Sequence, residues 1–382
     1  MLHFDSEFYR YTDSDTGADV TRLTGFRAHS NHLYFTNNSF YDNGRRIVFE
    51  SDRGNALNFF SLDLENGGID QLTEIAPLEY PREYPFHEAF VDAVNANCCF
   101  YAGGTLYRLS IKTRELVPIY RNPDGYINHI LSISPDGEYV YTSIIQNPAD
   151  RTKGDLTLRA IFESKPHSQI IRIPINGGSE KVLWEENNFI AHVNISPTDP
   201  TMLTFCHEGP WNLVDNRMWY ANTVTGEVGK LHPCKEGESI GHEYWYADGK
   251  RIGYHGHDNG RYIIGVINSD GTNDRTYDFP YRTGHTFSLD EKLIVGDGSA
   301  EGKFLRLWRL TDDGYEAPRA LCRHNCSFRR QRAHVHPRIT PDGKKVLYTS
   351  DESGYEQLYL ADIPEDLSVL PFISELAHLG AK

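Results

Sequence analysis

The sequence predicts an all-β fold, a seven-bladed β-propeller, and two observations support this prediction. A pattern of polar turn, short strand rich in Val, Ile, Tyr and Phe, polar tip and second strand recurs seven times along the 382 residues. A period of about 40 to 60 residues with about four strands per unit is typical of propeller blades. Helical periodicity is absent except in the last residues, 364–379, which disfavours a two-domain α/β fold.

Each repeat is marked by a turn motif, often with Asp-Gly or Asn-Gly, the pairs that form tight hairpin turns. The segment FYRYTDSDTGADVTRLT near the N-terminus resembles the second half of a blade. We expect it to pair with the last blade and close the ring, which leaves no free sheet edge. Residues 1–382 are therefore expected to form a single propeller domain. The seven motifs start at Tyr41, Val94, Ser134, Ser196, Tyr246, Ser288 and Thr340.

The composition limits the classes of function. The formal net charge is −15, whereas general nucleic-acid binding needs clustered Lys and Arg. The N-terminus carries no basic segment followed by an apolar run, and no apolar stretch approaches the roughly 18 residues of a membrane span. We therefore expect a cytoplasmic protein without a nucleic-acid or membrane partner, whose six cysteines are reduced thiols.

Histidines recur at one height of the predicted inner strands. The first strand of each propeller blade lines the central channel, and here it lies just before each turn motif. A single inner-strand histidine is most simply a packing residue, but several in register repel one another when protonated unless a metal or an anion uses them. The residues in register are His192, His242, His285 and His336, whereas His32, His87 and His129 fall outside it and are expected to be ordinary.

The segment 331–340, QRAHVHPRIT, is expected to be the inner strand of the last blade. Because strand side chains alternate, His334 and His336 would share one face, with Gln331 just upstream. Imidazole suits Zn, Mn, Fe, Ni or Cu, and a Gln carbonyl is a harder neutral donor. Neutral ligands leave the charge of the ion uncompensated, so such a site invites an anion, for instance a substrate carboxylate.

Further candidate binding residues lie near this segment and on an extended loop. The loop CHEGPWNLVDNRMW carries His207, Glu208, Trp211 and Arg217, and binding residues often lie on such loops. Arg217 could hold a carboxylate through two parallel hydrogen bonds. Solvated blade tips are the plain alternative for the arginines around the ligand segment, which are Arg323, Arg329, Arg330, Arg332 and Arg338.

Several motifs together resemble the oligogalacturonate lyases, over essentially the whole chain. They are CHEGPW followed by NRMW, GHEYWYADG, GHTFSLD and the Gln-x-x-His-x-His run. The resemblance implies a seven-bladed propeller with a manganese-type ion (Mn2+ or another divalent transition metal) held by three His and one Gln. Carried over by motif, the metal ligands are His285, Gln331, His334 and His336, the proton-abstracting residue is His242, and the substrate-binding arginine is Arg217.

The implied reaction is β-elimination on a short galacturonate oligomer. A metal-bound carboxylate would stabilise the enediolate-like transition state, Arg217 would add a second cationic contact, and His242 would remove the C5 proton. His192 could hold substrate or only pack, and His207 and Trp211 are expected to contact the sugar. The alternatives are a non-enzymatic TolB-like binding propeller and a lyase for another uronate, and homodimer formation is left open.

Overall fold

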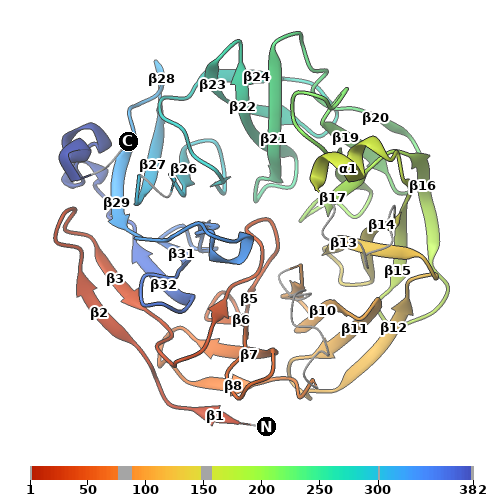
Figure 1. Cartoon of the computed structure of the whole chain (residues 1–382), viewed down its shortest axis with the longest axis horizontal. Helices are drawn as coiled ribbons and strands as arrows, with labels where there is room; N and C mark the ends of the chain where they lie inside the picture. The colour runs from red at the N-terminus through yellow and green to blue at the C-terminus, as the bar shows by residue number, and fades with distance from the viewer. Residues whose placement is uncertain (1, 76–87, 148–156, 300–301, 380–382) are drawn as a thin grey trace. The chain divides into compact units, whose positions relative to one another are not determined.

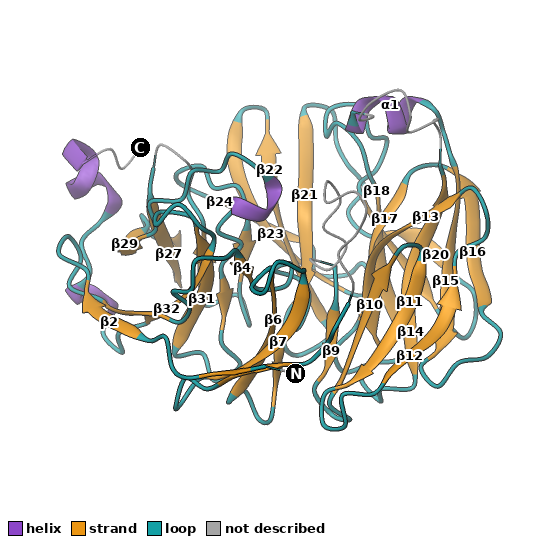
Figure 2. Cartoon of the chain, turned by 60° about the horizontal axis from the view of Figure 1, so that its bottom comes forward, coloured by secondary structure: helices purple, strands orange, loops and turns teal. Residues whose placement is uncertain are grey.

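Seven antiparallel sheets make up nearly all of the computed structural model (Figures 1 and 2). The structure describes residues 2–75, 88–147, 157–299 and 302–379. The number of sheets equals the number of sequence repeats, and the predicted all-β, seven-bladed propeller class is confirmed. The chain divides into two compact units, residues 1–87 with 277–382 and residues 88–276. That residues 1–382 form a single domain stays a prediction.

The first unit holds three sheets. One contains, in spatial order, β1 (His3–Phe4), β8 (Ile69–Gln71), β7 (Asn58–Asp63), β6 (Arg46–Ser51) and β4 (Ser30–Asn31), with β5 (Phe40–Tyr41) also on β6. The second contains β25 (Thr286–Phe287), β26 (Leu293–Gly296), β27 (Phe304–Thr311) and β28 (Gly314–Tyr315), with β29 (Arg319–Arg323) also on β27. The third contains β2 (Tyr9–Thr12), β3 (Asp19–Arg22), β32 (Gln357–Asp362), β31 (Lys345–Ser350) and β30 (Arg338–Ile339).

The third sheet joins the two ends of the chain, as the sequence predicts. Strand β3 pairs antiparallel with β32, so that Val20 lies opposite Ala361 and Arg22 opposite Tyr359. In Figure 1 the red strands β2 and β3 lie beside the blue β32. The N-terminal strands thus cover what would otherwise be an open edge of β32.

The second unit holds four regular four-stranded sheets, and apolar side chains of neighbouring sheets pack together between them. Tyr141 and Ile170, for example, share one buried cluster with Val193 and Phe205. The first two of these sheets consist of β9 (Phe90–Asp92), β10 (Asn97–Ala102), β11 (Thr105–Ser110) and β12 (Leu116–Arg121), and of β13 (Tyr126–Ile133), β14 (Tyr139–Gln146), β15 (His167–Pro174) and β16 (Lys181–Asn187). The other two consist of β17 (Ile190–Ile195), β18 (Met202–His207), β19 (Met218–Asn222) and β20 (Val228–Lys230), and of β21 (Glu238–Trp245), β22 (Arg251–Asp258), β23 (Arg261–Asn268) and β24 (Arg275–Asp278).

Helical structure is short (Figure 2). Helix α1 (Leu158–Glu163) was not predicted, and it begins at Thr157, whose side chain accepts a hydrogen bond from Ala160 N. The expected helical end of the chain forms only 3₁₀ turns, η3 (Leu367–Val369) and η4 (Ile373–Leu379). Within the described ranges, no helix has the length and apolar character that crossing a bilayer demands. The six cysteines form no disulfide there.

Candidate metal and catalytic site

Three predicted ligands meet in the first unit. One nitrogen from each of His285, His334 and His336 lies within 4.8 Å of the other two. The ring centroids of His285 and His336 are 4.4 Å apart. Metal–imidazole bonds of about 2 Å bring ligand nitrogens to within roughly 4 Å of one another, so this spacing suits a single ion.

The predicted strand over residues 331–340 is wrong. Residues Gln331–Ala333 form a 3₁₀ turn, η2, and only Arg338–Ile339 join the sheet, as β30. His336 has a positive φ of 44°, and the following Pro337 has no N–H to extend a ladder. The two histidines therefore converge through a turn and a left-handed residue and not through strand alternation.

Gln331 lies beside the histidines on this turn. Its Nε2 is 3.3 Å from His336 Nε2, and a half-turn of the amide brings Oε1 to the same place. A Gln carbonyl is then available at the edge of the imidazole cluster. The structure thus brings together all four predicted ligands.

A buried carboxylate that sequence reasoning missed orients His285. Asp297, at the end of β26, is 0% exposed. Its Oδ2 is 2.6 Å from His285 Nδ1, while Oδ1 accepts from Thr283 Oγ1 at 3.0 Å and from Gly284 N and His285 N at 2.9 Å each. With its proton on Nδ1, His285 has its lone pair on Nε2, the arrangement usual for metal-binding histidines.

His32 supports the cluster, although the sequence marks it as ordinary. It is buried, its Nε2 donates to the His336 carbonyl at 2.7 Å, and its Nδ1 is 2.7 Å from Thr349 Oγ1. Burial lowers the pKa of His32 to about 4, so the ring is neutral and fixed as the Nε2–H tautomer. Phe35 stacks on His336 with ring centroids 6.1 Å apart. The predicted ligand His336, with its left-handed backbone, is thus held at both its carbonyl group and its ring.

The arginines around this segment separate into two groups. Arg332 binds Glu50 and Asn31, which anchors the η2 turn to strands β6 and β4. Arg338 is bonded to the Phe35 carbonyl, and Arg323 pairs with Asp15 at 2.7 Å. Only Arg329 and Arg330 are exposed. Three of the five arginines therefore have structural contacts.

In the second unit, the predicted substrate-binding arginine lies between two carboxylates. Arg217 is 3% exposed, and its Nη1 is 2.7 Å from Glu208 Oε1 and its Nε 3.3 Å from Glu243 Oε2. Burial alone would raise the pKa of Glu208, but Arg217 and a hydrogen bond from His192 hold it well below its usual value. Both carboxylates thus pair with the Arg217 cation, and its Nη2 lies outside these two ion pairs.

His192 and His242 occupy the same kind of position on β17 and β21. Each lies in a β-bulge, where two residues of one strand stand opposite a single residue of the partner strand. Each also has a positive φ, which is 50° for His192 and 52° for His242. His129 is at the corresponding bulge of β13, with its ring centroid 5.7 Å from that of His192. The sequence places His129 outside the histidine register, because it lies one residue further from its turn motif than His192 and His242 lie from theirs, and therefore predicts no special role for it. Burial lowers the pKa of His129 to about 4.

The two remaining loop residues differ in their surroundings. His207 is buried, and its nitrogens lie 2.8 Å from Glu186 and 3.1 Å from Asp215, which favours a structural role. Trp211 packs edge-on against His242 with ring centroids 5.2 Å apart. His87 lies outside the described residues. Sugar binding by either His207 or Trp211 stays a prediction.

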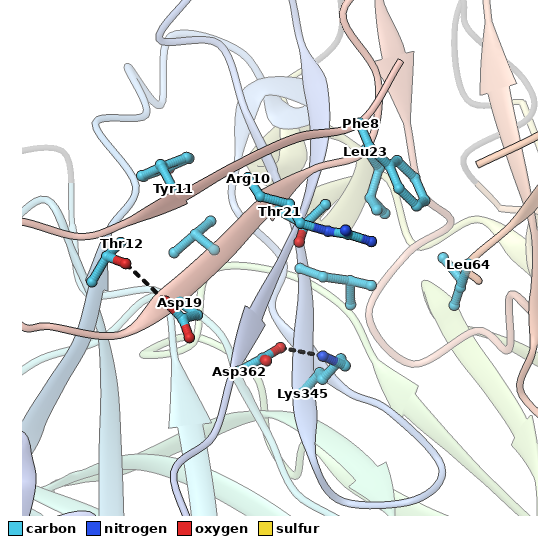
Figure 3. A pocket seen from close by; sticks show the side chains of 12 residues that line it. Phe8, Arg10, Tyr11, Thr12, Asp19, Thr21, Leu23, Leu64, Lys345 and Asp362 are labelled. Atoms are coloured by element: carbon cyan, nitrogen blue, oxygen red, sulfur yellow. Dashed lines mark hydrogen bonds and ion pairs between the residues drawn. The ribbon is translucent and has the colours of Figure 1, made fainter. Parts of the chain in front are cut away.

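A pocket of about 530 Å³ in the first unit contains none of these residues (Figure 3). Strands β2 and β3 line it together with Lys345, Asp362 and Leu64. Among its charged residues, Lys345 and Asp362 pair with each other, and Asp19 accepts a hydrogen bond from Thr12 at 2.9 Å. This pocket is separate from the predicted ligands.

Comparison with known proteins decides the family. The family model described as oligogalacturonate lyase matches residues 3–367. The chain belongs to the oligogalacturonate lyase family. An oligogalacturonide lyase of Pectobacterium atrosepticum is 30% identical over 94% of this chain and 97% of its own, and an oligogalacturonate lyase of Dickeya dadantii is 27% identical with the same coverage.

Solved structures of the oligogalacturonate lyase family have the same fold as this chain. An oligogalacturonate lyase in complex with manganese has a TM-score of 0.85 and 28% identity, covering 96% of this chain and 99% of its own. The enzyme of Vibrio parahaemolyticus also has a TM-score of 0.85, with 26% identity over 95% and 98%. The predicted membership of a polysaccharide lyase family is confirmed.

Proposed function

We propose that this protein is a metal-dependent lyase that cleaves short galacturonate oligomers, saturated or unsaturated, by β-elimination. The observation that carries the proposal is the convergence of His285, His334 and His336 within 4.8 Å of one another, backed by buried Asp297, in a chain of the oligogalacturonate lyase family. A binding propeller has no need of such a cluster. The TolB-like alternative is therefore the weaker one.

Mn2+, or another divalent transition metal, would be held by His285, His334, His336 and Gln331. The donor set fits, because His285 is fixed with its lone pair on Nε2 and the His334 Nδ1 is a buried nitrogen without a hydrogen-bond partner among the described residues. When bound, the ion supplies Lewis-acid stabilisation of negative charge on a substrate carboxylate. All four ligands are neutral, so they leave the charge of the ion available to that carboxylate.

His242 is the proposed proton acceptor. The C5 proton of the uronate moves to the imidazole, the C5–H electron pair forms the C4–C5 double bond, and the C4–O bond breaks with its electrons on the leaving oxygen. Arg217 is the proposed cationic contact of the substrate, through the part of the guanidinium outside its two ion pairs. His192 is held by Glu208 at 3.0 Å, which suits a hydrogen-bonding residue of fixed orientation.

The test is product formation from digalacturonate, followed by ultraviolet absorbance of the new C4–C5 double bond and by mass spectrometry. The wild-type enzyme should form one unsaturated uronate per bond cut. His242→Ala should lose about 10²- to 10⁴-fold in kcat while binding metal normally. Wild-type turnover by this variant would refute the assignment of the base, and saccharide binding without any product would favour the binding module.

Substrate choice within the uronates is tested by the same assay. Oligomers of galacturonate, glucuronate and mannuronate of equal length differ only in the configuration of the ring, so kcat/KM ranks them directly. Highest kcat/KM on galacturonate supports the proposal, and a strong preference for another uronate would replace it with the second alternative. Cytoplasmic location remains a prediction.

A further inference from the structure

A second histidine contacts the proposed base. His242 Nδ1 is 3.0 Å from His255 Nε2, with the two ring centroids 5.1 Å apart. His255 is on β22, directly opposite Gly241 of β21. The bulge that follows Gly241 places His242 and Glu243 opposite the single residue Tyr254. The bulge therefore lets the ring of His242 reach the neighbouring strand.

A tryptophan holds this pair in place. The indole of Trp211 meets both rings edge-on, with centroids 5.2 Å from His242 and 5.9 Å from His255. It occupies the space above Gly241, where an added Cβ would lie 2.4 Å from Trp211 Cζ2. His255 itself is 7% exposed. The two imidazoles thus have little freedom to rotate apart.

An imidazole–imidazole hydrogen bond restricts the protons of both rings. Each neutral ring has one N–H and one lone pair, and the bond uses the N–H of one ring and the lone pair of the other. If His242 donates, its proton is on Nδ1 and Nε2 is the basic nitrogen. If His255 donates, His242 carries its own proton on Nε2 and cannot act as a base there.

We propose that His255 is a positioning residue that accepts a hydrogen bond from His242 and so fixes His242 as the Nδ1–H tautomer. This inference rests on the proposed role of His242. When the C5 proton arrives on Nε2, His242 becomes an imidazolium, and its Nδ1–H bond to the neutral His255 becomes charge-assisted and stronger. His255 thus favours the state that follows proton transfer, without touching the substrate.

Three substitutions separate this role from packing. His255→Gln places an amide where Nε2 lies, and this amide can accept or donate. His255→Glu places a carboxylate there that only accepts, whereas His255→Leu removes the partner. We expect His255→Leu to lower kcat by about 10- to 100-fold with KM changed less than threefold, and both polar variants to recover most of the loss. His257→Leu, two residues along the same strand, is the matched control and should keep wild-type kcat.

The decisive measurement is the tautomer of His242 in the metal-free full-length protein, by ¹⁵N NMR with labelled histidine and His242→Gln for assignment. The wild type and His255→Glu should show the proton of His242 on Nδ1, and His255→Leu should show a mixture shifted toward Nε2–H. Nε2–H in the wild type, or wild-type kcat in a folded His255→Leu, would overturn the proposal. Because the NMR signal needs neither metal nor substrate, it remains interpretable if the lyase assignment fails.

Discussion

The buried carboxylate behind His285 should control metal affinity, and Asp297→Asn tests this. In the substituted protein the amide oxygen can still accept from Gly284 N and His285 N, the contacts that hold the loop at 2.9 Å. The amide nitrogen replaces Oδ2, which accepts from His285 Nδ1 at 2.6 Å. Because an amide N–H cannot accept, His285 must move its proton to Nε2, and the nitrogen that would bind metal is then protonated.

The expected effect is a 10- to 100-fold weaker binding of Mn2+, the usual size for loss of such a support, or about 1.4 to 2.8 kcal/mol of binding free energy. The fold should survive, since three of the four hydrogen bonds of Asp297 persist, with a loss of about 1 to 3 kcal/mol in the free energy of unfolding.

Isothermal titration with Mn2+ measures the affinity, and urea unfolding measures the stability of the same preparations. Asp290→Asn is the matched control, because Asp290 likewise accepts from a backbone amide, that of Lys292 at 2.8 Å, but in a turn outside the predicted ligand set. A folded Asp297→Asn protein that binds Mn2+ as tightly as the wild type and the control would show that Asp297 does not control metal affinity.

Two further predictions concern the second unit. Arg217→Met should lower the free energy of unfolding by about 3 to 5 kcal/mol, because Glu208 and Glu243 lose their shared buried cation. Urea unfolding measures this free energy. A value within about 1 kcal/mol of the wild type, the change expected for an average substitution, would contradict the prediction. His232 is buried between Asp274 at 2.6 Å and Glu238 at 2.9 Å, and although burial lowers its pKa, the carboxylates raise it above 6.5 overall. The stabilisation by protonated His232 is therefore complete below about pH 6.5 and is lost as the pH rises through the raised pKa. As the pH rises from about 6.5 through this pKa, the urea midpoint of the wild type should fall relative to that of His232→Gln. Parallel pH profiles of the two urea midpoints would disprove the prediction.

The fold could be predicted because each repeat carries its own local signals. Turn pairs such as Asp342-Gly343 and short apolar runs such as Val346, Leu347 and Tyr348 of β31 specify hairpins without long-range information. The pairing of β3 with β32 followed from one incomplete repeat. Helix α1 was missed because six residues are too few to show helical periodicity.

The resemblance of short motifs supplied Gln331, His334 and Arg217, and residue types that repeat in register supplied further residues of the predicted site. His285 and His336 were found in this way, but Asp297, His32 and His255 act through contacts between strands, which spacing along the chain does not reveal. The error over residues 331–340 has the same origin, because the turn at Gln331 is anchored by an ion pair of Arg332 with the distant Glu50 of β6. The left-handed conformation of His336 is likewise fixed by its surroundings and not by its own propensity.

The most direct test of the proposed function is the dependence of digalacturonate cleavage on metal occupancy. Protein stripped with a chelator is titrated with Mn2+, and bound metal and the rate of unsaturated product formation are measured on the same samples, with His336→Ala in parallel. The rate should rise in proportion to bound Mn2+ and level off at one ion per chain, and His336→Ala should neither bind the ion nor form product. Full activity in the stripped wild-type protein, or in His336→Ala without metal, would show that cleavage does not need the metal ion.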